Sequence, residues 1–154
     1  MAITTAAGIS STTVTTDQQA PLGFELVVPT ANGGEEVFIY VENDSGSTLV
    51  VGELQTRKAG SATYQVARAG AINAATIVGV AHVEIANGSF GFLLRKGHTT
   101  VKCGAAVTAD SGLKPAASGL VIHAAATDSA CGNTLAGKAG AGAGTLTAFV
   151  NCQG

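Results

Sequence analysis

The chain has 154 residues, a length that fits one domain and leaves no room for a second, catalytic one. Charged residues make up only 12% of the chain, against about 25% in ordinary soluble domains, while 46% is hydrophobic and 21 residues are Gly. The formal net charge of -2 excludes a cationic surface of the kind that wraps nucleic acid or adheres to an anionic membrane.

A surface with so few charges indicates a protein that is covered by partners, because large exposed apolar patches on a monomer favour association. No stretch reaches the length of about 20 apolar residues that spans a bilayer, and the first residues lack the basic and apolar regions of a signal peptide. We therefore expect a protein that is made and folded in the cytoplasm, contacts neither nucleic acid nor membrane, and functions in an assembly.

Residues 1–22 are rich in Ser, Thr, Ala and Gln, show no periodicity and end near Pro21. This composition is typical of an extended N-terminal arm that is disordered by itself. We expect residues 23–154 to form the head domain. The arm is expected to be ordered by pairing with an exposed sheet edge of a neighbouring subunit.

From Phe24 onward, short runs of β-branched and aromatic residues alternate with turn residues every 8 to 12 positions. This spacing predicts an all-β fold, either a β-sandwich or a small β-barrel of short antiparallel strands, with few or no helices. The clearest strand is Glu36–Asn43, which is followed by a turn and a predicted return strand at Thr48–Gly52. Tyr64–Arg68 is a further, shorter strand.

Ile77–Ile85 and Phe90–Lys96 are two predicted strands on either side of Asn87-Gly88. Asn-Gly supplies the positive φ angles of a tight two-residue turn, so the pattern predicts a β-hairpin. Gly97 is expected to start a new turn. Shorter strands are predicted later in the chain, at His98–Cys103, Val107, Leu113, Leu120–Ala124 and Thr145–Asn151. The glycines of residues 136–144 predict a loop there, and no repeat of fixed period appears.

Residues 132–138 come close to a phosphate-binding P-loop, but Ala139 stands where a hydroxyl is needed and the following glycines prevent the required helix. We interpret this stretch as a plain loop. His82 and Glu84 would share one face of a strand, and with His123 they could be imagined as a metal or acid-base site. A third ligand at a characteristic spacing is missing, so the solvated-surface interpretation is preferred.

Three cysteines, Cys103, Cys131 and Cys152, show neither zinc-site nor CxxC spacing and are expected to be reduced and buried. Cys103 follows Lys102, which could activate its thiol. The cluster of Arg95, Lys96, His98 and Lys102 is too small for nucleic acid and is expected to meet an acidic patch on a neighbouring subunit. We assign no catalytic, cofactor-binding or metal-binding residue.

Four segments resemble phage capsid decoration, or cement, proteins and related small virion proteins, and they stand in the same order as in that family. They are FIYVENDSGSTLVVGEL, IVGVAHVEIANGSFGFLLRKG, TTVKCGAAVTADSGLKPAASG and GAGTLTAFVNC. The Ala/Gly-rich residues 131–144 depart from the family pattern, in which a strand often precedes the last one.

The resemblance implies a β-sandwich or barrel head, a trimer, the major capsid protein as partner, and a place on the capsid surface of a virion without catalysis. The function expected from it is to stabilise the shell. A head-fibre subunit, a tail subunit and a host-surface binding module remain alternatives.

Overall fold

The computed structural model describes residues 9–70, 76–135 and 144–154, and these residues are almost entirely β-structure and connecting turns. The ten strands are β1 (Glu25–Pro29), β2 (Glu35–Asn43), β3 (Leu54–Arg57), β4 (Gln65–Arg68), β5 (Ile77–Ala81), β6 (Phe90–Cys103), β7 (Gly112–Pro115), β8 (Val121–His123), β9 (Gly132–Thr134) and β10 (Gly144–Asn151). One short 3₁₀ helix, η2, spans Ala117–Gly119. The predicted all-β class is confirmed. No helix in the described residues is long and apolar enough to cross a membrane.

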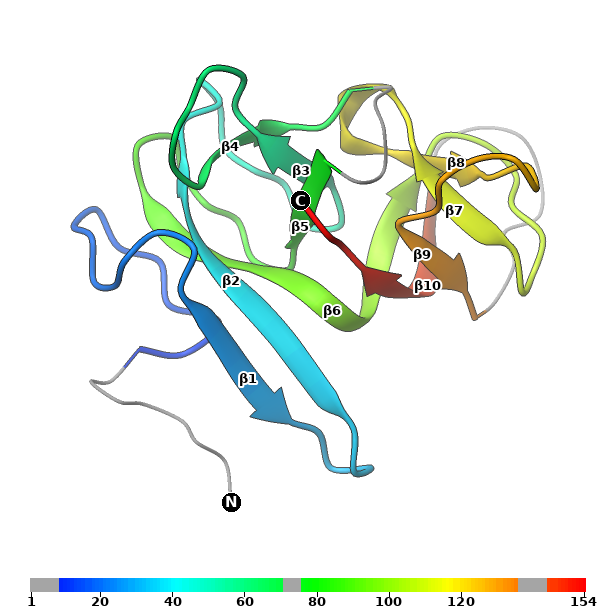
Figure 1. Ribbon diagram of the computed structural model, residues 1–154, viewed down its shortest axis with the longest axis horizontal. Coiled ribbons are helices and arrows are strands. Elements are labelled where there is room, and N and C mark those ends of the chain that lie inside the picture. Colours follow the sequence, from blue (N-terminus) through cyan, green and yellow to red (C-terminus); the bar gives the residue numbers. More distant parts are fainter. Residues whose placement is uncertain (1–8, 71–75, 136–143) are drawn as a thin grey trace.

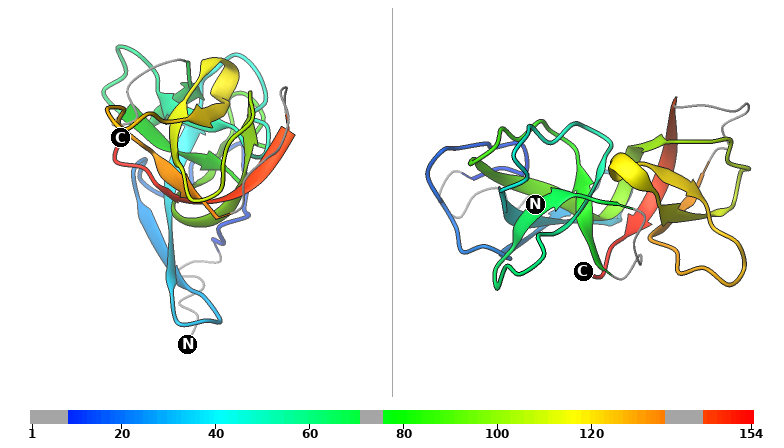
Figure 2. Two further views of the ribbon diagram at one scale, coloured as in Figure 1. Left: turned by 90° about the vertical axis from the view of Figure 1, so that its right-hand side faces the viewer. Right: turned by 90° about the horizontal axis from the view of Figure 1, so that it is seen from above.

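Strand β6 belongs to two closed rings of strands that lie side by side (Figures 1 and 2). The first ring runs β2, β4, β3, β5 and β6 and closes where β6 pairs with β2. The second runs β6, β10, β9, β7 and β8 and closes through the parallel pair Cys103 and Val121. We call these rings the first and the second barrel. The N-terminal half of β6 pairs with strands of the first barrel, and its C-terminal half pairs with strands of the second.

Gly97 lies where β6 passes from one barrel to the other. The predicted turn at this position is wrong, because β6 continues unbroken for 14 residues and Gly97 pairs with Val150 of β10. The φ angle of Gly97 is 143°, and a Cβ atom there would lie 2.8 Å from Cγ of Glu36. Glycine therefore allows the strand to change direction without losing its partners.

The Asn87-Gly88 turn forms, since the amide of Ser89 donates to the carbonyl of Ala86 at 3.1 Å, and the two strands predicted around it pair antiparallel, Val80 with Leu94 and Ala81 with Leu93. Strand β5 ends at Ala81 rather than at Ile85, which makes an isolated bridge with Leu49. The start of β6, next to the turn, pairs with β2 on its other side. The predicted return strand at Thr48–Gly52 is likewise reduced to the Leu49 bridge. The local turn thus joins β5 to β6, and closure of the barrel gives β6 its second partner, β2.

The same local structure follows strands β2, β5 and β6: a single bridge residue, a two-residue turn, and then the next strand. Its turns end at Gly52, Gly88 and Asp110, all three with positive φ. These positions are 36 and 22 residues apart along the chain, so no fixed period reveals the repetition.

Strands β1, β3 and β9 were not predicted. Strand β9 lies in residues 132–138, so the interpretation as a plain loop is wrong for Gly132–Thr134, which pairs with β7 and β10. The remainder of the predicted loop, residues 136–143, lies outside the described residues. Strands β2, β4, β7, β8 and β10 lie at predicted positions.

Strand β2 is buried on both faces and carries two hydrophobic clusters. Ile39 and Val41 belong to the smaller cluster, and Phe38 and Tyr40 belong to the larger one, which continues into the second barrel. The larger cluster includes Cys103, Leu113, Val121, Cys131, Leu146, Ala148, Val150 and Cys152 of that barrel. A shared strand and a continuous core therefore join the two barrels.

Candidate interaction surface

The residues weighed as a metal or acid-base site are not brought together. His82 follows β5 on a bend, so the alternation that would place Glu84 beside it is absent; Glu84 is exposed, and His123 lies on β8 of the second barrel. Within the described residues, no group of three or more His, Cys, Asp or Glu side chains is placed to hold a metal ion.

All three cysteines are free and buried in the second barrel. The thiol of Cys131 donates to the carbonyl of Leu113 at 3.4 Å, and burial raises its pKa to about 11. Burial also raises the pKa of Cys152 well above its ordinary value. Lys102 was considered as a residue that could activate the Cys103 thiol, but its ammonium group makes an ion pair with Glu53. Cys131 and Cys152 are thus packing residues held in the neutral thiol form.

The four basic residues predicted as a cluster point to different places. Arg95 pairs with Glu25 of β1 and donates to the carbonyl of Cys152, and Lys102 pairs with Glu53. Lys96 and His98 are exposed, with the His98 ring against Phe149. Arg95 and Lys102 therefore pair with acidic side chains of this same chain and not of a neighbouring subunit.

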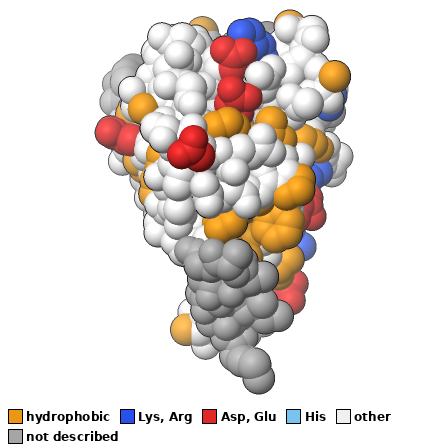
Figure 3. Space-filling view, turned by 90° about the vertical axis from the view of Figure 1, so that its left-hand side faces the viewer, with side chains coloured by type: hydrophobic (Ala, Val, Ile, Leu, Met, Phe, Trp, Pro, Cys, Tyr) orange, Lys and Arg blue, Asp and Glu red, His pale blue; other side chains and the backbone are white. Residues whose placement is uncertain are grey.

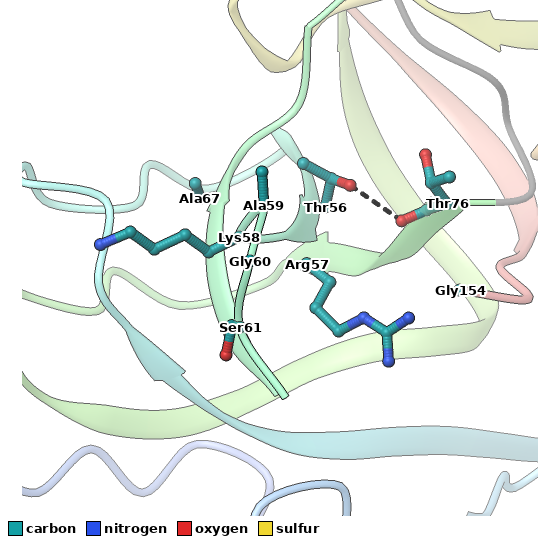
Figure 4. A pocket seen from close by; sticks show the side chains of 9 residues that line it. All are labelled: Thr56, Arg57, Lys58, Ala59, Gly60, Ser61, Ala67, Thr76 and Gly154. Carbon is teal, nitrogen blue, oxygen red and sulfur yellow. Dashed lines mark hydrogen bonds between the residues drawn. The ribbon is translucent and has the colours of Figure 1, made fainter. Parts of the chain in front are cut away.

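A hollow of about 550 Å³ opens between β3, the loop of residues 58–61 and Gly154 (Figure 4). Its cations are engaged within the chain, because Lys58 pairs with Asp44 at 2.6 Å and the guanidinium of Arg57 lies 5.9 Å from the centre of the Tyr64 ring. The hydroxyl of Thr56 donates to the carbonyl of Thr76 at 2.9 Å. This geometry does not resemble a ligand site with converging polar groups.

Strands β1 and β2 form a hairpin that projects away from the first barrel (Figures 1 and 2). β1 pairs only with β2 among the described strands, so its other edge is open. Val27 of β1 is 43% exposed and stands opposite Val37. β2 also pairs with β6 from Val37 onward, so only the tip of the hairpin is two-stranded. An open strand edge such as that of β1 is a site for pairing with another chain.

Apolar side chains gather on the face of the molecule formed by the N-terminal segment and this hairpin (Figure 3). Val14 is 37% exposed and Phe24 is 43% exposed. The ring of Phe24 lies 6.5 Å from that of Phe92, whose other neighbour is Tyr40 at 5.0 Å. The exposed Phe24 therefore lies against the buried aromatic side chains of the first barrel.

Residues 9–22 lie against the first barrel, while residues 1–8 lie outside the described residues. Thr15 makes an isolated bridge with Phe90, and the amide of Gln19 donates to the hydroxyl of Tyr40 at 3.0 Å. Nε2 of His82 lies 2.7 Å from the carbonyl of Ser11. Sequence reasoning missed these contacts because no pattern marks a partner 71 residues away in the chain.

Comparison with known proteins finds no family model that matches and no curated protein that matches. The fold is similar to a solved structure described as the N base of head fibre gp8.5 of bacteriophage phi29. The TM-score is 0.57 with 14% sequence identity, over 75% of this chain and 94% of that chain. The likeness shows that the two proteins share a fold that spans most of both chains.

Proposed function

We propose that this chain is a structural component of a phage virion, without enzymatic activity, which attaches to the outside of the capsid through subunit contacts. The observation that carries the proposal is the fold similarity to a phage head-fibre base, together with the resemblance of four sequence segments to capsid decoration proteins. The low charge content and the exposed apolar side chains of Val14, Phe24 and Val27 are consistent with a protein that binds other subunits.

Two roles fit this place, and they differ in what the protein does to the shell. A cement subunit binds only the assembled shell and thereby raises its stability by mass action. A head-fibre base attaches an appendage and need not change the stability of the shell. The fold similarity favours the head-fibre role and the sequence segments favour the cement role.

The proposed contact with the major capsid protein is the β1–β2 hairpin. Its open edge can accept an extended segment of a neighbour, and Val27 and Val37 offer apolar side chains beside that edge, with Glu25 and Glu35 on the same face. Self-association, with a trimer as the proposed state, would cover further apolar surface.

Co-sedimentation of the purified chain with shells that lack it tests the attachment. Wild-type protein is expected to pellet with the shells, and Val27→Asp is expected to remain in the supernatant. Val51→Asp is the matched control, because Val51 is 42% exposed but lies on the turn before β3. Equal binding of both variants would refute the hairpin contact, and absence of wild-type binding would refute the attachment.

Heating the loaded and unloaded shells separates the two roles. A cement protein is expected to raise the temperature at which the shells open, whereas a fibre base is expected to leave it unchanged. Light scattering of the free protein tests the trimer, and a monomer mass at micromolar concentration would refute it.

A further inference from the structure

Two tripeptides of identical sequence, Ala-Asn-Gly, occur in the chain, at residues 31–33 and 86–88. Both asparagines are exposed, and each is followed by a glycine with positive φ, 80° at Gly33 and 75° at Gly88. The first tripeptide lies in the turn between β1 and β2, and the second lies in the turn that precedes β6. The two asparagines have the same neighbours in the sequence, so a difference in their chemistry must come from the fold.

An asparagine followed by glycine can react with its own main chain. The main-chain nitrogen of the glycine loses its proton and attacks Cγ of the asparagine, a C–N bond forms, and the side-chain nitrogen leaves as ammonia. Water then opens the resulting succinimide ring at one of its two carbonyl groups and gives aspartate or isoaspartate. Glycine favours the attack because it has no Cβ atom to hinder the approach of its nitrogen. The reaction requires a free asparagine side chain and a main chain that can rotate.

In the second tripeptide both reacting groups are bound to another segment of the chain. Oδ1 of Asn87 accepts a hydrogen bond from the amide of Gly46 at 2.7 Å, and the amide of Gly88 donates to the carbonyl of Asn43 at 2.7 Å. Asn43 is itself fully buried, and its side-chain amide donates to two main-chain carbonyls. Both groups must therefore leave their partners before the nitrogen of Gly88 can reach Cγ of Asn87.

The first tripeptide lies at the tip of the β1–β2 hairpin, away from the first barrel (Figure 1). β2 pairs with β6 only from Val37 onward, so no third strand supports the turn. Within the turn, Gly33 donates to the carbonyl of Thr30 at 3.1 Å, and Gly34 is bound to Thr30 through its amide and its carbonyl. The side chain of Asn32 has no hydrogen-bond partner among the described residues. An exposed, two-stranded tip of this kind opens locally at low cost.

We propose that Asn32 is a site of spontaneous deamidation, at which the nitrogen of Gly33 displaces ammonia and water opens the ring to aspartate or isoaspartate. Asn87 is protected by the hydrogen bonds that its tripeptide makes with Asn43 and Gly46. The new carboxylate adds one negative charge to the formal net charge of -2, and isoaspartate also lengthens the main chain of the turn. The modification changes the hairpin tip as the protein ages, and it does not depend on the proposed attachment to a capsid.

The surroundings of Asn32 define what the modification does to the surface. Asn32 lines a hollow of about 710 Å³ that is also lined by Lys96, His98, Glu35 and Glu36. Lys96 and His98 are exposed. Deamidation adds a third carboxylate to this hollow, so the modified hairpin presents a more acidic surface to any partner.

Prolonged incubation of the full chain at pH 6 and at pH 8, followed by peptide mass spectrometry, tests the proposal. The peptide that contains Asn32 is expected to exchange its amide for a carboxyl group, and to do so faster at pH 8 because the attacking nitrogen must be deprotonated. The peptide that contains Asn87 is expected to react at least about tenfold more slowly, because more hydrogen bonds must open first. In urea the two peptides are expected to react at similar rates.

The comparison between folded and unfolded protein makes the result decisive. Equal rates at the two sites in the folded protein, or a faster reaction at Asn87, would overturn the proposal. An Asn32 that stays intact in the folded protein while it reacts in urea would overturn it as well.

The substitution Asn32→Gln is the matched control, because it keeps an exposed amide at the tip but requires closure of a larger ring, which is much slower. The acidic species that accumulates in ion-exchange chromatography of the wild-type protein is expected to disappear in this variant. Its undiminished formation in Asn32→Gln would show that the modified residue lies elsewhere and would contradict the assignment.

Discussion

The ammonium group of Lys102 lies 3.3 Å from Oε1 of Glu53, and the main-chain amide of Lys102 donates to the carbonyl of Gly52 at 2.8 Å. The second oxygen of Glu53 makes an ion pair with Nε of Arg68 at 2.8 Å. Lys102 belongs to the half of β6 that serves the second barrel, and Arg68 ends β4 of the first. One buried carboxylate therefore connects the two barrels.

Replacing Glu53 by Ala is expected to lower the free energy of unfolding by about 2 kcal/mol, because two charged partners lose their acceptor but remain partly open to water. Urea unfolding measures the change. Glu84→Ala removes an exposed carboxylate and is expected to change stability by less than about 0.5 kcal/mol. Equal effects of the two substitutions would show that the Glu53 pairs contribute nothing.

Gly97→Ala is expected to destabilise the chain by roughly 1–3 kcal/mol, because its φ of 143° and the nearby Cγ of Glu36 leave no place for a side chain. Gly112→Ala is the control. A Cβ there meets its nearest neighbour at 3.4 Å, an ordinary contact, and no positive φ is involved. Thermal unfolding of both variants checks the prediction, and an unchanged Gly97 variant would contradict the role of glycine in the bend of β6.

Tyr40→Phe removes the hydroxyl that accepts a hydrogen bond from the Gln19 amide. We expect this change to weaken the docking of residues 9–22 on the first barrel by about 1 kcal/mol. Hydrogen exchange at Gln19 and Thr15 should become faster, while exchange in β10 should not change. Tyr64→Phe is the control, because it also removes one hydroxyl but Tyr64 packs on the smaller cluster and Arg57. Faster hydrogen exchange at Gln19 and Thr15 in both variants would argue against a specific role of the bond between Gln19 and Tyr40.

Cys131 and Cys152 are expected to resist alkylation in the folded protein at pH 8 and to react in denaturant, because burial keeps both thiols protonated. The unfolded thiol of Cys131 ionises near pH 9, and the folded one at about 11. The stability from this shift is thus complete below pH 9 and is lost as the pH rises toward 11. Mass spectrometry of the alkylated protein and urea unfolding at pH 8 and pH 10 measure the two effects.

Individual strands with strong patterns could be predicted from the sequence, as could the pairing of β5 with β6 across a tight turn, whereas the other partners could not. The alternation in residues 36–43 and the β-branched run in residues 145–151 identify β2 and β10 because each depends on local residues alone. The Asn87-Gly88 turn was also found, but the partner of Ile85 is Leu49, which lies 36 residues earlier. Ring closure is a property of the whole sheet and leaves no local pattern.

The structural roles of Asn43 and of strand β1 could likewise not be predicted from the sequence. Asn43 is fully buried, and its side-chain amide donates to the carbonyls of Ser47 and Ile85, both at 2.7 Å, yet in the sequence it is one of several turn asparagines. Strand β1 was missed, although it lies in the predicted head domain, because its sequence ELVVP shows no alternation of apolar and polar residues. Its role as an open edge follows only from its pairing with β2.

Electron cryo-microscopy of the virus particles produced by the source of this sequence tests the proposed function most directly. We expect density for the two barrels on the outer surface of the capsid, with the β1–β2 hairpin directed at a neighbouring subunit. Particles that lack the chain altogether, or that carry it only inside the shell, would contradict the account.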